Sequence, residues 1–156
     1  MSGRASFNAE DWAVIVTAPY LIGMLMVAAD RGGTVQETMA IARALGEARS
    51  YYTQGLLSEV VSASPSLDPS LSPRHPEELR RQALAQLRRA LAALGRVASE
   101  EEINNYKRFV YFIAERVAHA HRHGGFLGFG GSEVSEQEQQ TLDEIAGILD
   151  EPLPQP

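Results

Sequence analysis

Apolar residues recur along this chain at spacings of three and four, which is the pattern of helices that bury one face. The stretch Trp12–Ala29 contains no charged residue and predicts a first helix from about residue 9 to residue 29, which Pro19 either kinks or divides into two segments. A second helix is predicted to start at a Thr34 cap and to run on toward Val61, with its glycines as weak points. The stripe that faces the core in this second helix comprises Ile41, Ala44, Leu45, Ala48, Tyr52 and Leu56.

Proline and serine dominate residues 62–76, which we expect to be a linker between two helical halves, about 9–61 and 99–149. Beyond the linker, the same periodicity predicts three more helices, followed by a tail over residues 150–156. These helices run from Glu77 to about Ala98, from a capping box at Ser99 to about Ala120, and from Glu136 to about Leu149. No segment is convincing as a strand. The chain is therefore predicted to be a single all-α domain, a bundle of about five helices.

Two helix starts share a signature that follows a Gly-Gly. In each, a Ser or Thr precedes a Glu by three residues, as in Thr34 with Glu37 and Ser135 with Glu138, which is the spacing of a reciprocal capping box. Apolar positions of the flanking helices also align between the two stretches, with a loop ten residues longer in the second. We interpret the halves as one helix-loop-helix unit used twice.

The absence of cysteine and the composition of the N-terminal residues limit the kinds of site and the cellular compartments to be expected. The chain has no cysteine, which excludes a disulfide framework, a thiolate metal site and a cysteine nucleophile, and favours a reducing, cytoplasmic compartment. The first eleven residues lack the order of a signal peptide. The uncharged stretch Trp12–Ala29 reaches the lower limit of a membrane span, but the central helix of an all-α core has the same composition. Membrane association stays an alternative to a core helix.

Charge is unevenly distributed in a chain with a net charge of −6. Residues 77–98 carry five Arg against two Glu, whereas residues 99–156 are strongly acidic. Nucleic-acid binding needs a basic face for phosphate contacts, so no nucleic-acid partner is predicted. The arginine-rich helix is interpreted as a solvated face or as an internal match for the acidic half.

Acidic residues near the two glycine loops suggest a cation site. Asp30 closes the first helix and Glu37 lies in the first turn of the next, so a short loop brings their carboxylates toward each other. Calcium and magnesium prefer several oxygen ligands, which makes Asp30 and Glu37 the first candidates for a divalent cation, with Glu133 and Glu138 next. Helix capping alone also explains Glu37 and Glu138.

A second cluster offers an alternative metal site. Glu115, His119 and His123 follow one another at intervals of four and share one stripe of a helix, a spacing that suits zinc or another transition metal. Histidines in a last helical turn also interact favourably with the helix dipole, which explains them without a metal. No nucleophile, base and orienting group occur at a suggestive spacing, so no enzyme is predicted.

These residues resemble a known family. Trp12, Ala18-Pro19 and the run into Asp30 before the capped Glu37 resemble the first half of the tellurite-resistance TerB-like family. Residues 112–118, the glycines of the second loop and residues 134–146 resemble its second half. The resemblance implies an all-α fold of two pseudo-twofold halves, acidic loop residues that hold a divalent cation, and a binding or scaffolding role in the response to tellurite or other stress. This chain departs from the pattern because an Arg follows Asp30 and the second loop has no Asp.

We therefore predict a non-enzymatic domain that binds a divalent cation or a protein partner, or that forms a homo-oligomer. One alternative is a structural subunit without a ligand that packs against a membrane protein through residues 12–29. The other is a histidine-based transition-metal binder.

Overall fold

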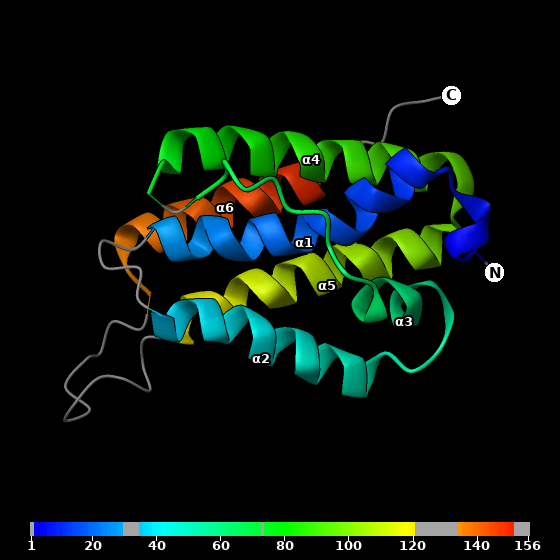
Figure 1. Ribbon diagram of the computed structural model, residues 1–156, viewed down its shortest axis with the longest axis horizontal. Coiled ribbons are helices and arrows are strands. Elements are labelled where there is room, and N and C mark those ends of the chain that lie inside the picture. The colour runs from blue at the N-terminus through cyan, green and yellow to red at the C-terminus, as the bar shows by residue number, and fades with distance from the viewer. Residues whose placement is uncertain (1, 30–34, 73, 121–133, 152–156) are drawn as a thin grey trace.

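The computed structural model describes residues 2–29, 35–72, 74–120 and 134–151, and all regular structure in these ranges is helical (Figure 1). The prediction of an all-α bundle is confirmed. A short 3-10 turn, η1 (Arg4–Ser6), precedes six helices: α1 (Ala9–Ala29), α2 (Val35–Tyr51), α3 (Gly55–Ser62), α4 (Pro76–Val97), α5 (Glu100–Ala118) and α6 (Glu136–Leu149).

The predicted second helix is in fact two, which is why the described residues hold six helices rather than about five. The helix α2 ends at Tyr51, and α3 begins at Gly55, whose φ of 75° lies in the left-handed region that residues with a side chain rarely adopt. This turn lets α3 bury its own apolar face, formed by Leu56, Leu57, Val60 and Val61. The other predicted weak point, Gly46, lies inside α2 without interrupting it.

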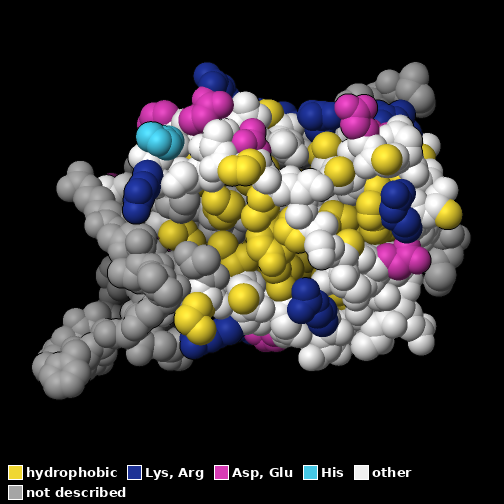
Figure 2. All heavy atoms as spheres, in the orientation of Figure 1, with side chains coloured by type: hydrophobic (Ala, Val, Ile, Leu, Met, Phe, Trp, Pro, Cys, Tyr) yellow, Lys and Arg dark blue, Asp and Glu magenta, His cyan; other side chains and the backbone are white. Residues whose placement is uncertain are grey.

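The helix α1 is the centre of the bundle and contacts each of the other five helices. Figure 1 shows it crossing the middle of the molecule, with α4 on one side and α5 and α2 on the other. Its length and composition would suit a membrane span, yet 72% of its most apolar window is buried inside the protein. Burial by neighbouring helices explains the uncharged stretch. Figure 2, in the orientation of Figure 1, shows hydrophobic side chains gathered over the middle of the visible face of the molecule. On α1, a stripe formed by Tyr20, Met24 and Ala28 is only half-buried.

The helix α1 runs through Pro19 without ending, and a side chain from α5 replaces the missing helix bond. Proline has no N–H, so the carbonyl of Ile15, four residues earlier, lacks its normal donor. The hydroxyl of Tyr106 donates to that carbonyl at 2.8 Å, and both residues are fully buried. Burial also raises the pKa of the Tyr106 phenol far above its ordinary value.

The predicted stripes of α2, α4 and α5 face the core, with Leu79, Leu87 and Ile113 among the fully buried side chains. In α6, helical periodicity predicts Leu142, Ile145, Ala146 and Leu149 on the inner face. The prediction is wrong at one position, because Ala146 is half-buried and Ile148 is buried instead. The linker packs against the bundle as well. The Ser66 amide donates to the buried Thr17 hydroxyl of α1 at 3.0 Å.

Three of the five arginines of α4 pair with carboxylates from elsewhere in the fold, and Arg81 pairs with Glu78 of α4 itself. Arg80 pairs with Glu144 of α6, and Arg88 pairs with Glu151 at 3.0 Å. Arg96 reaches back to Asp11 of α1 at 2.8 Å. Arg80 and Arg88 thus match acidic residues of the C-terminal part, which agrees with one interpretation of the charge of this helix. The paired arginines are also more than half exposed, which agrees with the other, a solvated face.

Candidate functional site: a groove between α2 and α5

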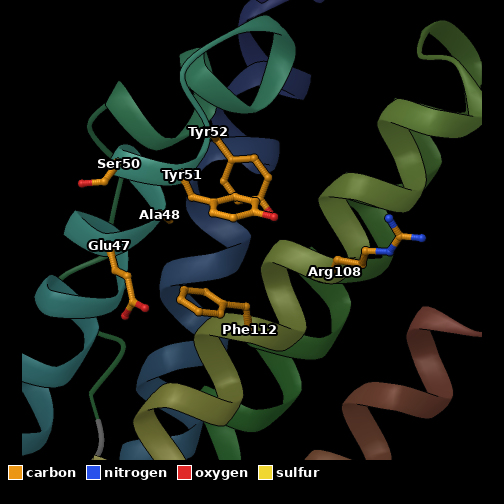
Figure 3. Close-up of a pocket in the computed structure, with 7 residues that line it drawn as sticks. All are labelled: Glu47, Ala48, Ser50, Tyr51, Tyr52, Arg108 and Phe112. Atoms are coloured by element: carbon orange, nitrogen blue, oxygen red, sulfur yellow. The ribbon is translucent and has the colours of Figure 1, made fainter.

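An open-sided pocket of about 480 Å³ lies between the end of α2 and the middle of α5. Figure 3 shows Tyr51 and Tyr52 projecting from the end of α2 toward α5, and Phe112 projecting from α5 toward α2. Ligand pockets in proteins are commonly of this volume and combine an apolar lining with a few polar groups. We call this pocket the α2–α5 groove, and it is lined by Glu47, Ala48, Ser50, Tyr51, Tyr52, Arg108 and Phe112.

The aromatic wall of the α2–α5 groove is anchored in the core. The ring of Tyr52 packs edge-on against two other rings. Its centre is 5.1 Å from the ring centre of Tyr51 and 6.0 Å from that of Phe109. Phe109 is buried and packs in turn against Tyr106 at 6.4 Å. Edge-to-face contacts of this kind are favourable and hold the rings in fixed orientations. The outermost ring, Tyr51, is nevertheless 79% exposed.

The polar groups of the groove differ in how they are satisfied. Glu47 pairs with Arg116 at 2.8 Å, and the guanidinium of Arg116 lies 5.1 Å from the centre of the Phe112 ring. Arg108 has no carboxylate within ion-pair distance in the described part of the chain, and its Nη1 is 3.5 Å from the amide oxygen of Asn105. Figure 3 shows the Arg108 side chain at the rim of the groove, pointing away from the rings of Tyr51, Tyr52 and Phe112.

Electrostatics around Tyr52 agree with this arrangement. Burial is the main cause that raises the pKa of its phenol, and the neighbouring Tyr51 adds to the rise. The positive charge of Arg108 acts on the pKa of the same phenol in the opposite direction.

The polar side chains of the lining are few, and its serine has no histidine beside it within the lining. The hydroxyl of this serine, Ser50, is 3.4 Å from the Gly46 carbonyl of its own helix. A hydroxyl without a neighbouring base is not an activated nucleophile. Apolar contact over the three rings, with one cation at the edge, is what these residues provide.

The predicted acidic cation site lies largely outside the described residues. Asp30 and Glu133 fall there entirely, and Glu37 lies on α2 with a side chain that is not described. Glu138 is described and is only 2% exposed. It forms the predicted capping box, because its Oε1 accepts from the Ser135 amide at 3.2 Å and its own amide donates to the Ser135 hydroxyl at 3.1 Å. Its Oε2 is buried without a hydrogen-bond partner in the described ranges.

The alternative histidine site is described only in part. Glu115 is exposed on α5, whereas His119 is the C-cap of that helix, with Nδ1 2.7 Å from the Glu115 carbonyl oxygen. His123 lies outside the described residues. Over the ranges that are described, no three metal-ligating side chains of the His, Cys, Asp and Glu types come together. The position of His119 agrees with the helix-end interpretation.

Sequence patterns did not single out Tyr51, Arg108 or Phe112. The available signal was modest: Tyr51 adjoins the end of the apolar stripe of α2 and forms an aromatic pair with Tyr52. No protein-family model, curated protein or solved structure matches this chain. The candidate site therefore rests on the chain's own geometry, and the TerB-like resemblance stays a prediction.

Proposed function

We propose that this chain is a non-enzymatic helical domain that binds a protein partner through the α2–α5 groove. The observation that carries the proposal is Tyr51, a large aromatic side chain that is 79% exposed beside an apolar pocket. Tyrosine and arginine are enriched among the residues that dominate binding energy at protein interfaces. Tyr51, Tyr52 and Arg108 supply both types within one groove.

A selection from a random peptide library tests this proposal. The immobilised wild-type chain serves as bait, and the double variant Tyr51→Ser with Phe112→Ser serves for counter-selection. Met39→Ser is the matched control, because Met39 is also exposed on α2, at 52%, about 18 Å along the helix from Tyr51. We expect peptides that bind the wild type and Met39→Ser alike and lose at least roughly tenfold in affinity on the double variant. Recovery of no such peptides would contradict the proposal.

A divalent cation is a second candidate ligand, which follows from the resemblance to the TerB-like family. On this proposal the chain has two related helix-loop-helix halves whose acidic residues, Asp30 and Glu37 first and then Glu133 and Glu138, hold calcium or magnesium in a stress or tellurite response. The buried Oε2 of Glu138, which has no hydrogen-bond partner in the described ranges, supports it. The location of Glu138 in the first turn of α6 opposes it, because the positive end of a helix dipole disfavours a cation.

Calorimetry with calcium, magnesium and zinc distinguishes these ligands. A calcium or magnesium signal that is lost in Asp30→Asn supports the acidic site. A zinc signal that is lost in His119→Ala with His123→Ala, and kept in Asp30→Asn, supports the histidine site instead. A wild-type chain that binds none of the three ions leaves the protein partner as the remaining proposal.

A further inference from the structure

The walls of the α2–α5 groove favour one class of occupant. We propose that the partner segment is an amphipathic α-helix that lays apolar side chains over Tyr51 and Phe112 and pairs a carboxylate with Arg108. This inference rests on the proposed function, because it names the chemistry of the partner that the groove binds.

The shape of the groove supports a helical occupant. On α2, Glu47 and Tyr51 line it four residues apart, and on α5, Arg108 and Phe112 do the same. Rows of side chains at intervals of four form the ridges between which another helix packs. A helix in such a groove is recognised through apolar anchors at positions i, i+3, i+4 and i+7.

The described fold offers less to an extended peptide. Recognition by strand addition needs an exposed sheet edge, and the ranges described here contain no strand. A proline-rich segment is the remaining mode, because it docks in aromatic-lined grooves. The paired four-residue rows on two neighbouring helices favour the helix over the proline-rich segment.

The charges around the groove favour a partner helix that carries carboxylates. At one end of the groove, Glu47 and Arg116 neutralise each other. Arg108 remains as the cation of the lining without a carboxylate partner in the described ranges. Because the whole chain has a net charge of −6, its overall field does not attract an acidic partner. A preference for an acidic helix therefore has to come locally from Arg108.

Two synthetic peptides of about 16 residues, long enough to form a helix in part, test the inference. Both carry the same leucine and phenylalanine anchors at i, i+3, i+4 and i+7. One has glutamates beside the anchors, and the other has lysines. Fluorescence anisotropy measures the affinity of each peptide for the full chain, for Arg108→Glu, for Tyr51→Ser and for the control Met39→Ser. Arg108, Tyr51 and Met39 are all exposed, and circular dichroism checks that each variant keeps its helical content.

We expect the wild type to bind the glutamate peptide about fivefold more tightly than the lysine peptide, the ratio that an exposed ion pair of about 1 kcal/mol provides. Arg108→Glu should reverse this order, Tyr51→Ser should weaken both peptides at least roughly tenfold, and Met39→Ser should change neither. Equal affinity for the two peptides, or an unchanged order in Arg108→Glu, would overturn the inference.

Failure of the inference can be told apart from failure of the proposed function. If neither peptide binds while the library selection yields proline-rich or other groove-dependent peptides, the helical acidic partner is wrong and the groove function stands. If the selection also yields nothing that depends on Tyr51 and Phe112, both are wrong.

Discussion

Removing one oxygen atom from Tyr106 tests how the core accommodates a proline inside its central helix. In Tyr106→Phe the ring can keep its packing, but the Ile15 carbonyl loses the donor that lies 2.8 Å away. Pro19 cannot replace that donor because it has no N–H. Since both Ile15 and Tyr106 are fully buried, water cannot replace it without opening the core. A buried acceptor left without a partner costs about 1–3 kcal/mol.

The size of this loss should depend on the residue at position 19. In Pro19→Ala, the new backbone N–H lies in helical register to donate to the Ile15 carbonyl. Tyr106→Phe in that background then leaves no unsatisfied acceptor and should cost less than about 0.5 kcal/mol. The double-mutant cycle is therefore expected to give a coupling energy of about 1 kcal/mol or more between two residues 87 positions apart in the chain.

Urea unfolding followed by far-ultraviolet circular dichroism measures all four free energies of unfolding. The slopes of the transitions show whether the variants unfold from comparable states. Total stability for a domain is about 5–15 kcal/mol, so a change of about 1–3 kcal/mol is well resolved. If Tyr106→Phe cost the same in the Pro19→Ala background as in the wild type, the hydroxyl would not be compensating for the proline, and the reasoning would be refuted.

Three further predictions concern the same fold. Burial raises the pKa of Tyr106 above its unfolded value of 10.0, so folded stability should fall as pH rises beyond about 10, and a pH series of urea unfolding should show a smaller fall in Tyr106→Phe. Gly23→Ala places a Cβ 3.0 Å from Ile41 Cγ1 and should lower the free energy of unfolding by about 1–3 kcal/mol. Gly46→Ala, whose new Cβ would have no atom within 4 Å, should raise that free energy by up to about 1 kcal/mol. The opposite order of the two variants in thermal unfolding would contradict the described contact of α1 with α2. Gly55→Ala forces a left-handed backbone on alanine and should cost about 1–2 kcal/mol despite open space around it, and an unchanged urea midpoint would show that the turn into α3 does not need glycine.

Local chemistry made several helix boundaries predictable from the sequence. Ser99 with Glu102 and Ser135 with Glu138 form two of the three capping boxes that the spacing predicted, because each box satisfies helix-start groups within four residues. The third, at Thr34, lies outside the described residues. The core stripes followed from periodicity for the same local reason. The start of α3 could not be predicted from periodicity. The positive φ of Gly55 is required by the packing of α3 against the bundle, which the local pattern does not contain.

Contacts between distant segments could not be predicted in this way. The bond from Tyr106 to Ile15 joins residues 91 positions apart, and periodicity identifies both only as core residues. The α2–α5 groove depends likewise on how two helices pack side by side, so its residues show no pattern of their own. The acidic and histidine metal candidates were inferred from residue type and spacing. In the described ranges, Glu138 lies in the first turn of α6, His119 is the C-cap of α5, and Glu115 is exposed on α5.

One aromatic chain connects the core to the candidate site. It begins at the Ile15 carbonyl, passes through Tyr106 and Phe109, and reaches Tyr52 and then the exposed Tyr51. Each ring packs against the next, so contacts that run back to the core form the wall of the groove before any partner binds. A preformed wall reduces the ordering cost of binding, which suits the proposed role.

The most direct test of the α2–α5 groove is chemical-shift mapping on the uniformly nitrogen-15-labelled chain during titration with a peptide from the library selection. The account predicts that shifted amides cluster at the end of α2, around Tyr51 and Tyr52, and along α5 near Arg108 and Phe112. Shifts that cluster instead on α4, or along the half-buried stripe of α1 at Tyr20 and Met24, would contradict it.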